Sequence, residues 1–304
     1  MDELAVHTEH LTKSYDGKSC ALQDLSIDVA QGEVFGFLGP NGAGKTTTVK
    51  LLNGLLKPSK GSGTIFGMSS SLRSADIHRI CGVMTDSAHM YASMTGKENL
   101  VFFAETSGMQ SQEANARAED LLKQMDLWDA RDKQLRAYST GMAQRLSLAR
   151  TLVNHPKILF LDEPTSGLDP ESAQAVNELI HTLGRSEGVT VFLCTHQLRY
   201  AQDICERYGI IEDGRLLACG TLEALGKGVQ IFMKVALRLA DGDKLLNFTQ
   251  GENNWWTSDL LREDDMPALL KKLVEEGHSI YEAYIVRPTL EDVYFRYVRK
   301  EEAH

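Results

Sequence analysis

The chain alternates short apolar runs with segments in which apolar side chains recur every three or four positions. Three runs have the length of buried strands: Val34–Leu38, Ile158–Leu161 and Thr190–Cys194. Helical spacing marks three further segments: Glu98–Ser107, Ser111–Met125 and Glu171–Leu183. Strands alternating with helices predict a largely parallel sheet covered on both faces. We also expect the helix that follows the first run to end at Lys57, because proline comes next.

The rest of the pattern predicts the domain organisation. Strand-like segments separated by Gly and Asp turns fill roughly residues 1–66. Residues 88–155 predict an inserted helical subdomain. The pattern breaks near Gly226. Beyond it, apolar residues alternate with others over 233–239 and recur at helical spacing over 266–274. A further helix is expected to begin with a cap formed by Thr289 and Asp292. These segments predict a small α+β domain. We expect a main domain over 1–228 and an accessory domain over 229–304.

Composition and charge exclude several classes of protein. A net charge of -10 argues against sequence-independent nucleic-acid binding, which needs a field of lysine and arginine. The polar, acidic start predicts no signal peptide, and no run approaches the roughly 18 apolar residues that span a bilayer. The five cysteines show no metal-binding spacing and are expected to be free thiols. We expect a cytoplasmic chain whose membrane role comes through a partner.

The strongest chemical signal is a glycine-rich loop between the first apolar run and a helix. Its residues are Gly39, Pro40, Asn41, Gly42, Ala43, Gly44, Lys45, Thr46 and Thr47. Such a loop lets backbone N–H groups converge on phosphate oxygens at a helix N-terminus. We expect Lys45 to reach the β and γ phosphates and the Thr46 hydroxyl to ligate Mg²⁺. The loop therefore predicts a site that binds the phosphates of a nucleotide.

A second signal follows the apolar run that ends at Leu161. The next residues are Asp162 and Glu163, and the carboxyl ends of strands in an open parallel sheet form its ligand site. We expect Asp162 on the magnesium side, directly or through water. Glu163 is placed to orient or deprotonate the attacking water. Together with the glycine-rich loop, this pair predicts a site that hydrolyses a nucleotide phosphate.

These motifs and those around them resemble the ATP-binding cassette (ABC) family over roughly residues 3–222. The segments that carry the resemblance are Tyr138-Ser-Thr-Gly-Met142, Asp162-Glu-Pro-Thr-Ser-Gly-Leu-Asp169 and the glycine-rich loop. The resemblance implies an α/β P-loop NTPase core with an antiparallel N-terminal subdomain and a helical insert. It also implies that Tyr15 stacks on adenine and that His196, after the third apolar run, senses the γ-phosphate.

The stretch from Tyr138 to Met142 resembles the signature motif of that family. The resemblance implies that Ser139, Gly141 and Met142 complete the nucleotide site of a second subunit, so that two ATP molecules lie between two chains. It further implies transmembrane permease partners and a peripheral place on the inner face of the cell membrane. The ending Pro288-Thr-Leu-Glu-Asp-Val-Tyr294 is similar to that of cassette subunits in drug, antibiotic and lipid exporters, and this resemblance implies export rather than import. Two identical chains are the simpler expectation.

One position departs from the family pattern. Where the family usually has glutamine after the strand leading into the helical insert, this sequence has Asp86. A carboxylate can still ligate Mg²⁺. We expect Asp86 to replace the glutamine as a metal ligand, without its amide donor.

Several alternatives stay open at this point. A soluble cassette ATPase acting on ribosomes usually carries two cassettes, and one acting on DNA carries long coiled coils, neither of which is seen here. The accessory domain could serve dimerisation or regulation, or only brace the structure. Trp255 and Trp256 fit an interface anchor or a small core equally well.

Overall fold

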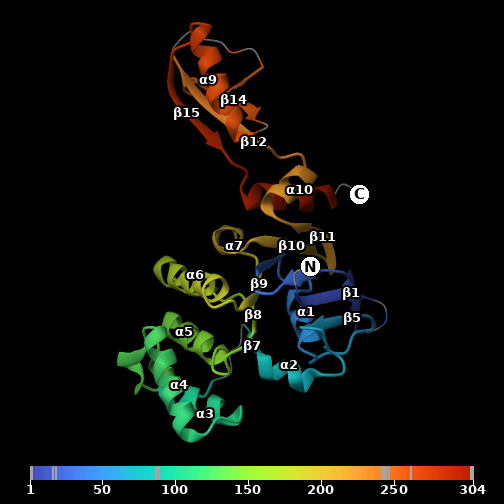
Figure 1. Ribbon diagram of the computed structural model, residues 1–304, viewed down its shortest axis with the longest axis vertical. Coiled ribbons are helices and arrows are strands. Elements are labelled where there is room, and N and C mark those ends of the chain that lie inside the picture. Colours follow the sequence, from blue (N-terminus) through green and yellow to red (C-terminus); the bar gives the residue numbers. More distant parts are fainter. Residues whose placement is uncertain are drawn as a thin grey trace. The chain divides into compact units, whose positions relative to one another are not determined.

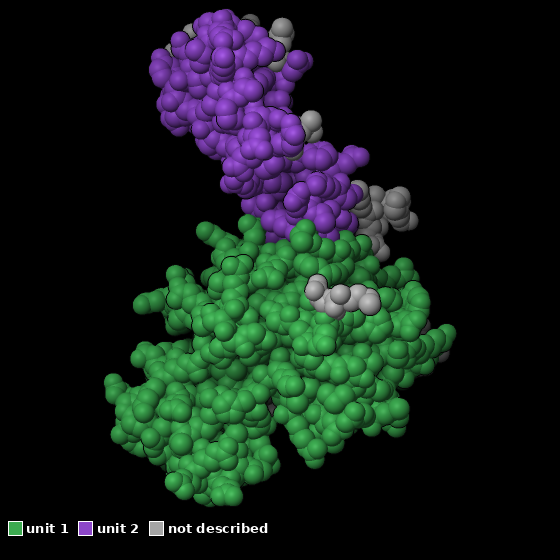
Figure 2. Space-filling model, in the orientation of Figure 1, with its two compact units in different colours: residues 1–221 green, residues 222–304 purple. Residues whose placement is uncertain are grey.

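The computed structural model describes residues 3–15, 17, 19–85, 90–240, 245, 247–260 and 262–301. The chain divides into two compact units, Met1–Thr221 and Leu222–His304, which Figure 2 colours green and purple. Among the described residues, no helix combines the length and the apolar composition that crossing a bilayer requires.

The first unit is built on a six-stranded sheet. In spatial order its strands are β11 (Arg215–Gly220), β10 (Arg207–Glu212), β4 (Val34–Leu38), β9 (Thr190–Thr195), β8 (Ile158–Asp162) and β7 (Cys81–Met84). The neighbours from β10 to β7 pair in parallel, and only β11 runs antiparallel. The three apolar runs are therefore strands, and the expected largely parallel sheet is confirmed.

A smaller antiparallel sheet is formed by strands that lie before and after β4 in the chain. Its strands are β1 (Leu4–Ser14), β2 (Cys20–Leu25), β3 (Asp28–Ala30), β5 (Lys60–Ile65) and β6 (Met68–Ser69). This sheet is the antiparallel subdomain expected for the first 66 residues.

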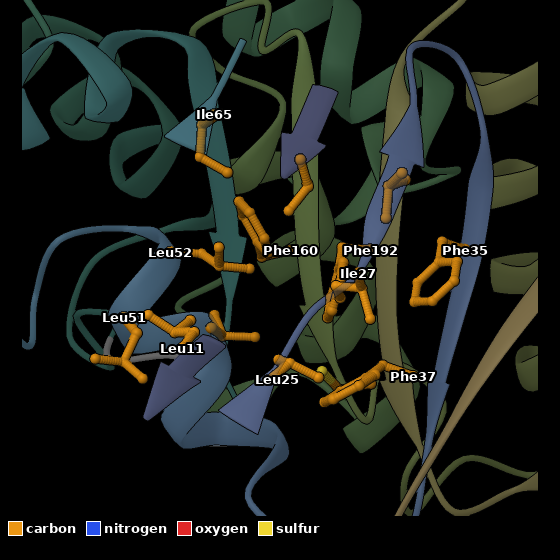
Figure 3. Packing of buried hydrophobic residues seen from close by; sticks show 14 of the residues in the cluster. Leu11, Leu25, Ile27, Phe35, Phe37, Leu51, Leu52, Ile65, Phe160 and Phe192 are labelled. Carbon is orange, nitrogen blue, oxygen red and sulfur yellow. The ribbon is translucent and has the colours of Figure 1, made fainter. Parts of the chain in front are cut away.

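The main core of the first unit joins side chains from both sheets and from helix α1 (Lys45–Leu52). Figure 3 shows Leu11 and Ile65 of the antiparallel sheet converging with Phe160 of the parallel sheet. The Phe192 ring lies 5.3–5.6 Å from the rings of three other phenylalanines of the parallel sheet, centroid to centroid. This aromatic packing fixes the strands whose carboxyl ends carry the glycine-rich loop and the acidic pair.

Helix α1 ends at Leu52, not at Lys57, so the boundary predicted from Pro58 is wrong. The reason is Gly54, whose φ of +70° is left-handed and ends the helix. A Cβ at Gly54 would lie 2.3 Å from the backbone oxygen of Ser70, so only glycine fits. Leucine spacing continues beyond the helix, but Leu55 is exposed.

Each of the remaining helical segments of the first unit leads along the chain into a strand of the six-stranded sheet, as Figure 1 shows. Between β7 and β8 lie α3 (Gly96–Thr106), α4 (Ser111–Gln124), two 3₁₀ turns (Trp128–Ala130 and Leu135–Ala137) and α5 (Thr140–Thr151). The other connections are α2 (Ser74–Ile80), α6 (Pro170–Arg185) and α7 (Leu198–Ile204). The predicted helical insert is thus present, and the capping box of Thr95 and Glu98 begins its first helix.

The second unit contains an antiparallel sheet in the order β13, β14, β12, β15. Its elements are α8 (Leu222–Gly228), β12 (Met233–Leu239), β13 (Thr249–Gln250), β14 (Trp255–Leu260), a 3₁₀ turn (Glu263–Asp265), α9 (Met266–Glu275), β15 (Ile280–Val286) and α10 (Leu290–Glu301). Helix α9 covers one face of the sheet through Leu273. Trp256 is buried on that face, whereas Trp255 lies in edge contact with Tyr284. The aromatic pair is therefore divided between a core position and a partly exposed one.

Candidate functional site

The glycine-rich loop runs from the end of β4 into α1 and is shaped by two glycines. A Cβ at Gly39 would lie 2.2 Å from the backbone oxygen of Ile211. Gly44 has a φ of +105°, and a Cβ there would lie 2.6 Å from the backbone oxygen of Ala21. Because side chains are excluded at both positions, the backbone N–H groups of the loop can approach a phosphate closely.

Lys45, the first residue of α1, is held inside this loop. Its ammonium donates hydrogen bonds to the backbone oxygens of Gly39 at 2.6 Å and Pro40 at 3.1 Å. The side chain is 6% exposed, and its Nζ lies 3.6 Å from a carboxylate oxygen of Glu163. A buried cation therefore lies between the loop backbone and the acidic pair.

Thr46 and Asp162 connect the loop to the end of β8. The Thr46 hydroxyl donates a 2.6 Å hydrogen bond to Oδ2 of Asp162, whose side chain is buried. A hydroxyl and a carboxylate side by side offer the oxygen ligands that Mg²⁺ prefers. These two residues were predicted as metal ligands, and the structure brings them together.

Glu163 is oriented by three contacts from the end of β9. Its Oε2 accepts a 2.8 Å hydrogen bond from the Thr195 hydroxyl, and its Oε1 accepts one of 3.0 Å from the backbone N–H of His196. The same Oε1 lies 2.7 Å from Nδ1 of His196, whose ring is half-exposed. Glu163 has a φ of +51°, a conformation uncommon outside glycine that is found at functional sites.

A cleft of about 200 Å³ lies among these groups. Its lining residues are Ala21, Pro40, Asn41, Gly42, Gly44, Lys45, Thr46, Thr47, Asp162 and Glu163. Ala21, from β2, was not expected here, because a small residue on a distant strand carries no signal in the sequence. Beside the cleft, complete burial raises the pKa of the Cys194 thiol well above its usual value, so this group stays neutral near Asp162.

The predicted signature residues lie at the start of α5 and do not line this cleft. Ser139 is the exposed N-cap of α5, and its hydroxyl accepts a 3.2 Å hydrogen bond from the backbone N–H of Met142. A Cβ at Gly141 would lie 3.0 Å from the hydroxyl of Ser172. The Gln144 amide donates a 2.8 Å hydrogen bond to the backbone oxygen of Pro164, next to Glu163. Sequence reasoning assigned no role to Gln144.

One further predicted residue, Tyr15, stands apart from the cleft. Tyr15 is 63% exposed and has the ammonium of Lys13 5.4 Å from its ring centroid, but it does not line the cleft. Its exposed ring has a free face on which a base could stack. Asp86 lies outside the described residues, so its predicted metal contact stays a prediction.

Comparison with known proteins places these motifs in context. Residues 22–166 match the ABC transporter family. The daunorubicin resistance ATP-binding protein DrrA2 of Streptomyces coeruleorubidus is 34% identical over 97% of this chain and 95% of its own length. The bacitracin transport ATP-binding protein BcrA of Bacillus licheniformis is 38% identical over 70% of this chain and 68% of its own length. Neither relative is named for ribosomes or DNA.

Solved structures agree with this assignment. An ATP-binding cassette solved as a dimer with ADP and phosphate, in a post-hydrolysis state, has a TM-score of 0.66 at 27% identity; the match covers 71% of this chain and 98% of that one. The cbiO1 subunit of Clostridium perfringens, part of the ABC transporter complex cbiONQ, has a TM-score of 0.67 at 26% identity, over 75% of this chain and 94% of that one. Because the resemblance to DrrA2 extends over almost the whole sequence, the chain belongs to the ABC transporter family, as an ATP-binding and ATP-hydrolysing subunit.

Proposed function

We propose that two copies of this chain bind ATP with Mg²⁺ and use its hydrolysis to drive export through a separate transmembrane permease. The observation that carries the proposal is the convergence on one cleft of a buried lysine, a hydroxyl–carboxylate pair and a glutamate held by hydrogen bonds. These are the groups that bind phosphates, hold a divalent cation and orient a water for phosphoryl transfer.

Each group at the cleft has a chemical role in this proposal. The N–H groups of the loop from Gly39 to Thr47 bind the phosphate oxygens, and Lys45 offsets their charge. Thr46 and Asp162, with Asp86 as a further candidate, would hold Mg²⁺, which when bound neutralises charge on the phosphates.

Glu163 accepts hydrogen bonds from Thr195 and His196 and is thereby held in one orientation. A carboxylate at the end of β8 is suited to orient the attacking water and to accept its proton. His196, in contact with Glu163, would hydrogen-bond the γ-phosphate. Tyr15 would stack on adenine.

The dimer in this proposal explains why Ser139, Gly141 and Met142 lie away from the cleft. The start of α5 presents an exposed hydroxyl and helix N–H groups, which attract anions. In the proposed dimer this surface closes over the phosphates of the other copy. The dimeric cassette with ADP and phosphate that resembles this chain supports such an arrangement.

The names of the relatives support export. One relative is a daunorubicin resistance protein and another a bacitracin transport protein, and both are ATP-binding subunits. Since the described residues contain no membrane-spanning helix, the pathway would lie in a separate permease, and this chain would act at the inner face of the membrane.

The Glu163→Gln variant tests the proposal. It should still bind ATP but turn it over slowly, so that the ATP-bound dimer accumulates and is seen by size-exclusion chromatography with light scattering. Glu187→Gln, at an exposed residue after α6, is the matched control and should remain active. Rapid turnover by Glu163→Gln, or a monomer at saturating ATP, would contradict the assigned roles.

A further inference from the structure

The second unit has a cleft of about 480 Å³ between α10 and the ends of β12 and β15. This volume falls within the range of roughly 300–1,000 Å³ that is usual for small-molecule sites. The side chains that matter most for its chemistry are Phe232, Lys234, Val286, Phe295, Arg296 and Arg299. None of them belongs to the nucleotide site.

The cleft is positively charged, although the whole chain has a net charge of -10. Lys234, Arg296 and Arg299 have no carboxylate within salt-bridge distance among the residues that the structure describes. A fourth cation, Arg287, is paired with Glu263. Within the described part of the chain, these three cations therefore form no salt bridge.

Asp292 is the one carboxylate that lines this cleft among the residues with a described position. Its Oδ2 accepts hydrogen bonds from the backbone N–H of Thr289 at 2.9 Å and from the Thr289 hydroxyl at 2.6 Å. These hydrogen bonds at the start of α10, together with the nearby positive charge of Lys234, lower the pKa of Asp292, so its carboxylate is ionised. Its single negative charge offsets one of the three cations, so the cleft keeps an excess of positive charge.

Helix α10 is anchored so that its charged face stays turned toward the cleft. Leu290 and Val293 are fully buried, and the Tyr297 hydroxyl donates a 3.1 Å hydrogen bond to the backbone oxygen of Leu225 in α8. Arg296 and Arg299 lie three positions apart, so they share one side of the helix. Like charges at this spacing cost a few tenths of a kcal/mol, and a bound anion would remove that cost.

Large apolar side chains border the same cations. Phe232 and Val286 are 40% exposed and Phe295 is 51% exposed, and all three line the cleft. A ligand with charge alone would leave this apolar surface in water. A purely apolar ligand would bury the cations without a partner, which costs free energy. The ligand that satisfies both surfaces carries an anionic group on an apolar body.

We propose that this cleft binds an anionic amphiphile, a molecule with one carboxylate, sulfonate or phosphate group attached to an aliphatic or aromatic body. Arg296 and Arg299 bind the anion, and Phe232 and Phe295 cover the apolar part. A second cleft of about 630 Å³ in the same unit shares Phe232 and Arg287 with the first, so a longer apolar body has room to continue. The second unit is thereby a ligand-binding module as well as a structural appendage.

A pair of matched amphiphiles tests the proposal on the full-length chain. Decanoate and nonyltrimethylammonium have the same nonyl chain and opposite charge, and calorimetry at concentrations where both are monomeric gives their affinities. Decanoate should bind at least tenfold more tightly. Vesicles of phosphatidylglycerol, assayed by co-sedimentation, show whether the same anionic chemistry is recognised within a lipid surface.

Substitutions in the second unit test whether decanoate binds at this cleft. Arg296→Gln with Arg299→Gln should weaken decanoate binding by at least roughly tenfold, which corresponds to about 1.4 kcal/mol. Phe295→Ser should weaken it independently of charge. Lys271→Gln with Lys272→Gln, at exposed positions of α9, is the matched control and should bind as the parent does. Circular dichroism and ATPase activity without amphiphile should stay unchanged in all variants.

Three results would overturn the proposal. The first is equal affinity for the two amphiphiles, which would mean that the cations do not select the ligand. The second is unchanged decanoate binding when both arginines are replaced. The third is binding to phosphatidylglycerol vesicles without any binding of monomeric decanoate, which would assign the patch to a membrane surface and not to a cleft ligand.

Discussion

Replacing Thr195 by valine removes one hydrogen bond that orients Glu163 and leaves the side-chain volume nearly unchanged. The Thr195 hydroxyl donates to the carboxylate at 2.8 Å and accepts a 3.0 Å bond from the backbone N–H of Gln197. A hydrogen bond to a charged group contributes about 1.5–3 kcal/mol. Because two contacts from His196 to the carboxylate remain, we expect the lower end of this range, or roughly a tenfold loss in kcat. Thr195 does not line the cleft, so KM for ATP should change little.

Thr190→Val is the matched control for this experiment. Thr190 lies on the same strand, is equally buried, and its hydroxyl accepts a 3.0 Å hydrogen bond from the backbone N–H of Gly32. Both variants leave one backbone N–H without its partner, so both should lose about 1–3 kcal/mol of unfolding free energy in urea titrations. Only Thr195→Val should lose kcat in a steady-state ATPase assay. An unchanged kcat for Thr195→Val, or an equal loss in Thr190→Val, would refute the positioning role of Thr195.

Three further predictions address the loop, the core and the second unit. Gly39→Ala should weaken ATP binding at least roughly tenfold in a fluorescent-nucleotide titration, because the added Cβ would clash with the backbone oxygen of Ile211. Phe192→Ala should lower the unfolding free energy by about 3–5 kcal/mol in urea, since its ring is fully buried among three others; a loss under 1 kcal/mol would contradict this packing. Asp292→Asn should melt below the parent at pH 7. The pKa of Asp292 is lower in the folded state than its ordinary value of about 3.8. The charged side chain therefore stabilises the fold above that value, and this contribution is lost as the pH falls through the folded-state pKa. A difference in melting temperature between parent and variant that stays constant down to pH 3 would refute the argument.

Much of the fold follows from local signals in the sequence. The runs that became β4, β8 and β9 are apolar at nearly every position because parallel strands are buried on both faces. The glycine-rich loop could also be predicted from the sequence, because a backbone that must approach phosphate closely requires glycines. The acidic pair followed from its place at the end of β8.

Other features depend on contacts between distant parts of the chain. The end of α1 was misplaced because a left-handed Gly54, fitted against the backbone of Ser70, ends the helix before the proline does. Ala21 enters the cleft only through the folding of β2 beside the loop. The positive φ of Glu163 likewise has no signature in the sequence, because neighbouring strands and their hydrogen bonds impose it.

The hydrogen bond from Gln144 to the backbone oxygen of Pro164 joins two regions with separate tasks in the proposed dimer. Helix α5 has its exposed N-terminus one turn from Gln144, and Pro164 follows Glu163 directly. A displacement of α5 caused by a nucleotide held in the other copy would pull on the peptide next to Glu163. Hydrolysis of one ATP would then depend on whether a nucleotide is still bound at the other site. This dependence would require no large rearrangement of either chain.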